Sequence, residues 1–118
     1  MGAFNLKGWF NEVKRLNSGD FAGWVTGTVA HVKKGQRRAI VLEDNQVACL
    51  NYRYGEDVII KKDDVLSFEC VAQNIKKPYG NNSYITCNSY AITFVNGEYG
   101  TFDIFANKSA EFNILLKK

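Results

Sequence analysis

Apolar positions along the chain change their spacing once, near residue 20. Before that point they recur every three or four residues, which is the period of an amphipathic helix. The pattern predicts an N-terminal helix over residues 1–19, which either docks on the core of the domain or offers Trp9 and Phe10 to a partner. The apolar positions of this helix are Leu6, Trp9, Phe10, Val13 and Leu16.

From Phe21 onward the period is two, which is typical of half-buried strands. Five strands are expected in this region, and the short turn at Glu43–Asn45 should join the second and third as a hairpin. Residues 58–60, between the third and fourth strands, fit either a brief helix or an extended connector. The expected strands begin at Phe21, Ala39, Gln46, Val65 and Tyr84.

Glycines mark two special points in these strands. Gly23 and Gly27 lie inside the first strand, where glycine indicates a bend or the close approach of another backbone. Asn96-Gly97 is a strong hairpin signal, because both residues tolerate positive φ. A sixth strand over residues 98–105 should therefore pair back on the fifth.

The remaining segments are residues 74–83 and the C-terminal tail, and the sequence is less decisive about their structure. Residues 74–83 are polar and contain the single proline, so a long loop is expected there. The tail over residues 110–116 is ambiguous, because its apolar residues alternate as in a strand while Ser109 is suited to cap a short helix.

Length and composition place the chain among ordinary folded domains. It has 118 residues and many aromatic and β-branched side chains, which suits one all-β domain with small helical additions. We expect neither a signal peptide nor a membrane span, and hence a cytoplasmic protein. Cys49, Cys70 and Cys87 each lie in an apolar stretch, so three buried free thiols are expected.

Cationic and aromatic side chains gather at three places, although the net charge is only +3. A basic turn over residues 33–38 follows the first strand, two lysines precede an aromatic residue in the 74–83 loop, and an arginine lies between two tyrosines after the third strand. The candidate binding residues are Trp24, Lys33, Lys34, Arg37, Arg38, Tyr52, Arg53, Tyr54, Lys76, Lys77 and Tyr79.

The order of these elements resembles an OB-fold. The resemblance is carried by "GWVTGTV" in the first strand, "RRAIVLEDNQVACLNY" in the second and third, and "KKDDVLSFECVAQ" leading into the fourth. It covers about residues 21–95, and a chain of this size with one barrel looks most like the small single-stranded DNA-binding proteins of phages, mobile elements and microbes. It implies a single OB-fold-like domain over residues 1–118: a five-stranded barrel over 21–95, with a C-terminal strand extension over 96–118.

In an OB-fold the ligand crosses the second and third strands between the loops that follow strands one and four. Both loops are basic here, and single-strand binding needs cations along the phosphates and aromatic faces for the bases. The resemblance thus implies a non-enzymatic protein that binds single-stranded nucleic acid, DNA in preference to RNA, with little sequence specificity, in replication, recombination or repair.

Structural alternatives remain for each of these side chains. The basic turn also fits a solvated loop, and Tyr52 and Tyr54 share one face, which is either core or open. Trp24 is either exposed for stacking or covered by the N-terminal helix. Tyr79 has the least structural reason to be aromatic, whereas Tyr84 fits core or cross-strand packing.

Residue patterns for catalysis, metal binding and cofactors are missing from the sequence. The cysteines lack paired metal-ligand spacing, and we find neither a glycine-rich phosphate loop nor a nucleophile–base pair. We therefore expect no enzyme, no metal and no cofactor. The alternatives are an RNA- or tRNA-binding module, and a protein-interaction subunit that uses the N-terminal helix and a C-terminal strand. An unpaired edge strand would also permit a homodimer.

Overall fold

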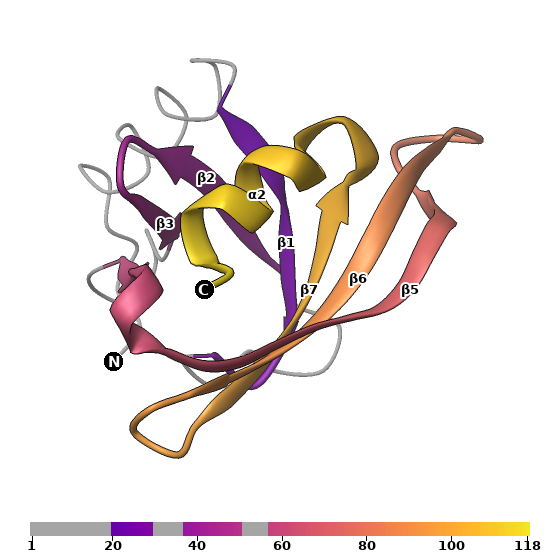
Figure 1. Cartoon of the computed structure of the whole chain (residues 1–118). Coiled ribbons are helices and arrows are strands. Elements are labelled where there is room, and N and C mark those ends of the chain that lie inside the picture. Colours follow the sequence, from indigo (N-terminus) through magenta and orange to yellow (C-terminus); the bar gives the residue numbers. More distant parts are fainter. Residues whose placement is uncertain (1–19, 30–36, 51–56) are drawn as a thin grey trace, which may run out of the picture.

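The computed structural model describes residues 20–29, 37–50 and 57–118, and its strands form one antiparallel sheet in the order β4-β3-β2-β1-β7-β6-β5 (Figure 1). Two single-turn 3-10 helices, η2 (Lys62–Asp64) and η3 (Ala106–Lys108), and one α-helix, α2 (Ser109–Leu116), complete the described part. The strands are β1 (Phe21–Gly27), β2 (Arg38–Glu43), β3 (Gln46–Cys49), β4 (Val58–Ile60), β5 (Val65–Pro78), β6 (Tyr84–Phe94) and β7 (Tyr99–Phe105).

The sheet consists of two meanders and stays open. Strands that are consecutive in the chain are neighbours, except β4 and β5, and the one long-range pairing among the described strands joins β1 to β7. Its edges, β4 and β5, are not paired with each other, because β4 has only three residues and η2 turns the chain before β5 begins. The prediction of a closed five-stranded barrel was therefore wrong.

The expected hairpins were confirmed. β2 and β3 pair in register from Glu43↔Gln46 inward, with Asp44 and Asn45 in the turn. The Asn96-Gly97 turn joins β6 to β7; Gly97 has φ +91°, and Phe94 N–H donates to the Glu98 carbonyl at 2.8 Å. The predicted helix over residues 1–19 lies outside the described residues.

The expected loop over residues 74–83 was wrong in extent. β5 continues to Pro78, pairing with β6 as far as Tyr84, so the loop keeps only residues 79–83. The strand tolerates this polar sequence because it is an edge, and its register shifts between Cys70 and Ala72 and between Ala72 and Ile75. Residues 58–60 are the edge strand β4, which settles that segment as extended.

At Gly23 the backbone of β1 lies close to the backbone of β7. It has φ +148°, and a Cβ built there would lie 2.0 Å from the carbonyl oxygen of Asp103 on β7. Only a residue without a side chain allows β1 and β7 to approach this closely, and the register of β1 shifts between Phe21 and Gly23. The close approach expected from the glycine is confirmed.

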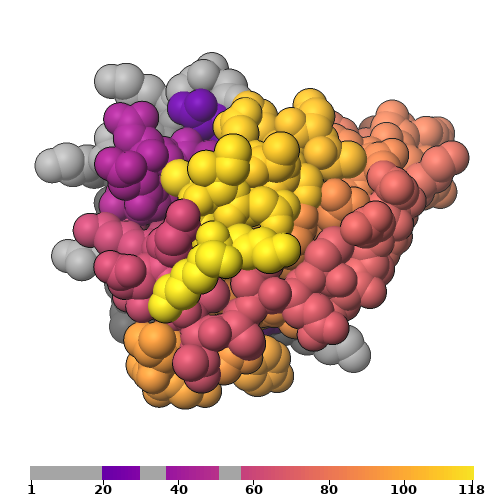
Figure 2. All heavy atoms as spheres, viewed as in Figure 1, coloured from indigo at the N-terminus to yellow at the C-terminus, as the bar shows by residue number. Residues whose placement is uncertain are grey.

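The core lies on the concave face of the sheet, and α2 covers it. Phe112 and Leu116 are four residues apart and so share one side of the helix, where both are fully buried. The ring of Phe112 packs 5.7 Å from Phe68, 5.0 Å from Tyr90 and 6.0 Å from Phe102, between centroids. Figure 2 shows α2 filling the space between β3 on one side and β5 and β6 on the other.

The tail is thus a helix, which is one of the two alternatives left open for residues 110–116. The extra hairpin strand expected over residues 98–105 is β7, so the strand extension predicted over 96–118 was wrong only beyond Phe105. Ser109 does not cap α2; it is buried, and its hydroxyl bonds to Tyr90 Oη and accepts from Asn88 Nδ2 at 2.9 Å. This polar contact ties the start of the helix to β6.

All three cysteines are free thiols. Cys49 and Cys87 are buried, as expected, but Cys70 is exposed, because it lies in the irregular edge strand β5. Burial raises the pKa of Cys49 to about 12, and it also raises the pKa of Cys87, where the nearby Asp103 carboxylate adds to the effect. No helix in the described part of the chain is long and apolar enough to cross a membrane.

Candidate nucleic-acid interface

The face of the sheet turned away from α2, called the outer face below, carries most of the candidate binding residues that the structure describes. Side chains alternate between the two faces along each strand. On β7, Phe102 and Ile104 enter the core, so Thr101, Asp103 and Phe105 belong to the outer face. Contacts with these three residues therefore identify what else lies on this face.

Four aromatic rings pack together on the outer face, and we call Phe21, Trp24, Tyr79 and Phe105 the aromatic cluster. Trp24 meets Phe105 edge to face at 5.2 Å and Phe21 at 5.5 Å, between centroids. Tyr79, from the loop after β5, lies 5.8 Å from Trp24 and 6.1 Å from Phe105. Tyr79 keeps 44% of its surface exposed, so the cluster has an accessible edge.

A cation lies over this cluster. The guanidinium carbon of Arg37 is 5.3 Å from the ring centroid of Trp24, which is within the range of a cation–π contact. Arg37 immediately precedes β2 and is exposed, while Trp24 is half-buried. The last part of the basic turn and the loop after β5 therefore meet at one tryptophan.

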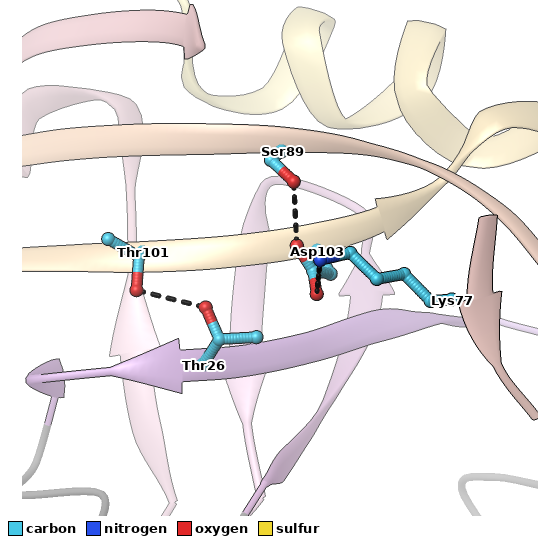
Figure 3. Close-up of polar contacts among 5 residues, drawn as sticks. All are labelled: Thr26, Lys77, Ser89, Thr101 and Asp103. Atoms are coloured by element: carbon cyan, nitrogen blue, oxygen red, sulfur yellow. Dashed lines mark hydrogen bonds and ion pairs between the residues drawn. The ribbon is translucent and has the colours of Figure 1, made fainter. Parts of the chain in front are cut away.

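Next to the cluster lies a shallow polar depression that crosses β1, β7, β6 and β5. In it Ser89 Oγ donates to Asp103 Oδ1 at 2.8 Å, and Lys77 Nζ lies 3.6 Å from Asp103 Oδ2 (Figure 3). Asp103 is only 6% exposed. The hydroxyls of Thr26 and Thr101 are 2.9 Å apart. Its lining residues are Thr26, Arg37, Val71, Lys77, Ser89, Tyr90, Thr101, Phe102 and Asp103.

Trp24, Arg37, Lys77 and Tyr79 are therefore the sequence-predicted residues that the structure brings together. They come from β1, the start of β2, the end of β5 and the loop after it. The short distances among them join two loops that lie about forty residues apart in the sequence, as the single-strand binding hypothesis requires.

Two other predicted cations point away from this face. Arg38 is in register with the core residue Val25, so its side chain lies on the α2 side of the sheet. Lys76 follows the same alternation, since it is the direct neighbour of the outer-face residue Lys77 within a regularly paired stretch of β5. The other predicted residues, Lys33, Lys34, Tyr52, Arg53 and Tyr54, lie outside the described residues.

Several residues of this face were missed from the sequence. The pairing of β7 with β1 places three of them on this face, namely Thr101, Asp103 and Phe105. Local sequence patterns do not predict this pairing. The alternation of these three residues along the predicted sixth strand was the signal available. Tyr84, expected in the core or in cross-strand packing, is instead 69% exposed. Its partner in register is Pro78, one residue beyond Lys77, which places Tyr84 on the face opposite Lys77.

The outer face combines aromatic, cationic and hydroxyl groups. Within the described ranges, no three histidine, cysteine, aspartate or glutamate side chains come together in a way that would hold a metal ion. What the face offers is a partly open aromatic edge, two cations and several hydroxyl groups. Comparison with protein-family models, with curated proteins and with solved structures found no match to this chain.

Proposed function

We propose that this protein binds single-stranded nucleic acid on the outer face of its sheet, with little sequence preference and without catalysis. The observation that carries the proposal is the contact of Arg37 and Tyr79 with the same tryptophan, Trp24. It joins a phosphate-seeking cation to rings that can stack on bases, and these are the two ingredients of single-strand binding.

The aromatic cluster supports stacking because its rings pack on a buried residue while one of them remains accessible to solvent. Trp24 and Tyr79 are both held by Phe105, which is buried, while Tyr79 remains half-exposed. A base that stacks on such a ring contributes about 1–3 kcal/mol to binding, whatever its identity. Pre-positioned rings also reduce the ordering cost of binding.

The cations support a path for the phosphates beside the rings. Arg37 and Lys77 both line the depression, which adjoins the cluster through Arg37. In the sequence, Lys33 and Lys34 lie shortly before Arg37 and add to the basic character of this segment. The preference for DNA over RNA rests on the resemblance of the sequence, and the role in replication, recombination or repair is proposed on the same ground.

Titration of the full chain with oligo-dT, followed by tryptophan fluorescence, tests the proposal directly. If about five or six phosphates are neutralised, the logarithm of the affinity should fall against the logarithm of the salt concentration with a slope near −4. Competition with oligo-dU and with duplex DNA then separates DNA from RNA and single from double strands. A flat salt response, or absence of binding at low salt, would refute the proposal.

The first prediction concerns Tyr79. Tyr79→Ala should weaken oligo-dT binding by about 5- to 150-fold, because one stacking surface worth about 1–3 kcal/mol is lost. Tyr79→Phe keeps the ring and should bind like the wild type. Tyr84→Ala is the matched control, because it removes an exposed tyrosine from the other face of the same hairpin. Equal losses in Y79A and Y84A would show that the outer face is not the binding surface.

The protein-interaction alternative loses one of its two elements. It relied on an apolar C-terminal strand, but these residues form α2, whose Phe112 and Leu116 are fully buried in the core. Deleting residues 107–118 should therefore unfold the domain instead of removing a docking strand, and it cannot serve as a test of partner binding.

A further inference from the structure

The polar depression contains an acidic side chain where an anion-binding surface would be expected to have none. Asp103 is almost fully buried, yet one of its carboxylate oxygens lies 3.6 Å from the ammonium of Lys77. The other oxygen accepts from Ser89 Oγ at 2.8 Å, which fixes the carboxylate in place. Figure 3 shows Lys77 reaching from β5 toward Asp103, with Ser89 on the other side.

We propose that this depression is the subsite for one backbone phosphate of the bound strand, and that Asp103 competes internally with that phosphate for Lys77. The inference rests on the proposed function and adds to it the position of a phosphate and the residue that limits affinity there. Arg37, which lines the same depression and covers Trp24, connects this phosphate to the base stacked on the aromatic cluster.

The competition follows from the charges that share the depression. Lys77 and Asp103 form a pair of opposite charge, so in the free protein Arg37 supplies the net positive charge among these three groups. A phosphate would use the ammonium of Lys77 as a hydrogen-bond donor, and its negative charge is repelled by the carboxylate of Asp103. The carboxylate cannot turn away easily, because it is buried and bonded to Ser89. Binding of the strand must therefore draw Lys77 away from Asp103.

Charge removal at Asp103 should consequently strengthen binding, which is the opposite of the usual effect of a substitution in a binding site. Asp103→Asn keeps the shape and the acceptor for Ser89 while removing the charge. We expect oligo-dT affinity at low salt to rise about threefold to fivefold, as for a partly exposed ion pair. The salt slope should steepen by about 0.7, because one more phosphate is neutralised without displacing a carboxylate.

Two further variants assign the effect to Lys77. In the D103N background, Lys77→Gln should remove the whole gain in affinity and the added salt slope. In the wild-type background, Lys77→Gln should change affinity less than about twofold, since Asp103 already neutralises this lysine. Glu111→Gln is the matched control, because it removes a carboxylate that also lies beside a lysine, Lys108, but belongs to α2 on the opposite side of the sheet, and it should leave affinity nearly unchanged.

Fluorescence anisotropy of labelled oligo-dT, at three salt concentrations, measures all five proteins, and circular dichroism melts verify their folding. Unchanged or weaker binding by folded D103N would overturn the inference while leaving the proposed function intact. A gain that persists in K77Q/D103N, or an equal gain in E111Q, would also overturn it. If D103N does not fold, a loss of more than about twofold in K77Q alone would overturn it, and a smaller change would support it. No binding by any of the proteins would overturn both proposals.

Discussion

Replacing Phe112 by alanine tests whether α2 is a structural part of this open sheet. Phe112 is fully buried, and its ring is surrounded by the rings of Phe68, Tyr90 and Phe102 at centroid distances of 5.7, 5.0 and 6.0 Å. The substitution removes a ring that buries on the order of 150–250 Å². It also leaves a cavity that rigid strands on one side and a short helix on the other fill poorly.

The expected cost follows from these two terms. Phe→Ala substitutions in packed cores lower the free energy of unfolding by about 3–5 kcal/mol, and three aromatic neighbours place this site in the upper part of that range. The total free energy of unfolding of a native domain is only about 5–15 kcal/mol. F112A should therefore lower the urea midpoint strongly, or leave the chain unfolded at room temperature.

Urea denaturation followed by far-UV circular dichroism measures the effect, with Ile114→Ala as the matched control. Ile114 lies two residues away on the same helix and is 71% exposed, so its removal should change the unfolding free energy by less than about 0.5 kcal/mol. If F112A lost less than about 1 kcal/mol, or no more than I114A, α2 would be an appendage, and the core described above would be incorrect.

Two further predictions concern the backbone and the thiols. Gly23→Ala should cost about 3 kcal/mol or more in an equilibrium unfolding experiment, because its Cβ would lie 2.0 Å from the Asp103 carbonyl oxygen; Gly80→Ala, with open space around it, should cost about 1–2 kcal/mol. The Cys49 pKa is raised by burial from 9.0 to about 12, so the protonated thiol contributes stability that is complete below pH 9 and is lost progressively as pH rises toward 12. Cys49→Ala should flatten this alkaline decline by up to about 1.4 kcal/mol per pH unit, whereas substitution of the exposed Cys70 should not, and equal slopes in the two variants would contradict the assignment.

Local signals predicted local structure well here. The alternation of apolar residues and the turn residues at 44–45 and 96–97 located most strands and both tight hairpins, because these features depend on neighbours in the sequence. The polar run through Lys76 and Lys77 hid the end of β5, since an edge strand needs little apolar surface. Apolar and polar residues alternate in the tail as in a strand, but the tail forms α2, in which Phe112 and Leu116 are buried at helical spacing.

Long-range strand pairing could not be predicted from local sequence patterns. This pairing determines both the architecture of the sheet and the composition of its outer face. The sequence resembled a closed barrel, whereas the pairing of β1 with β7 makes an open sheet and forms the outer face. Trp24, Arg37, Lys77 and Tyr79 were predicted from residue type and from their place in the expected strands and loops. Arg38 and Lys76 had equally suitable types, but strand register turns them to the opposite face.

The pairing of β1 with β7 also determines when the outer face forms. β1 to β4 form one meander and β5 to β7 another, and each can assemble from hairpins, whereas β1 and β7 join residues as far apart as Thr26 and Thr101, separated by 75 positions. Loop-closure entropy makes such a contact the slow one. Trp24 belongs to the first half, and Phe105 and Tyr79 to the second. A half-folded chain therefore lacks the aromatic cluster, and the proposed binding surface forms in the same event that completes the sheet.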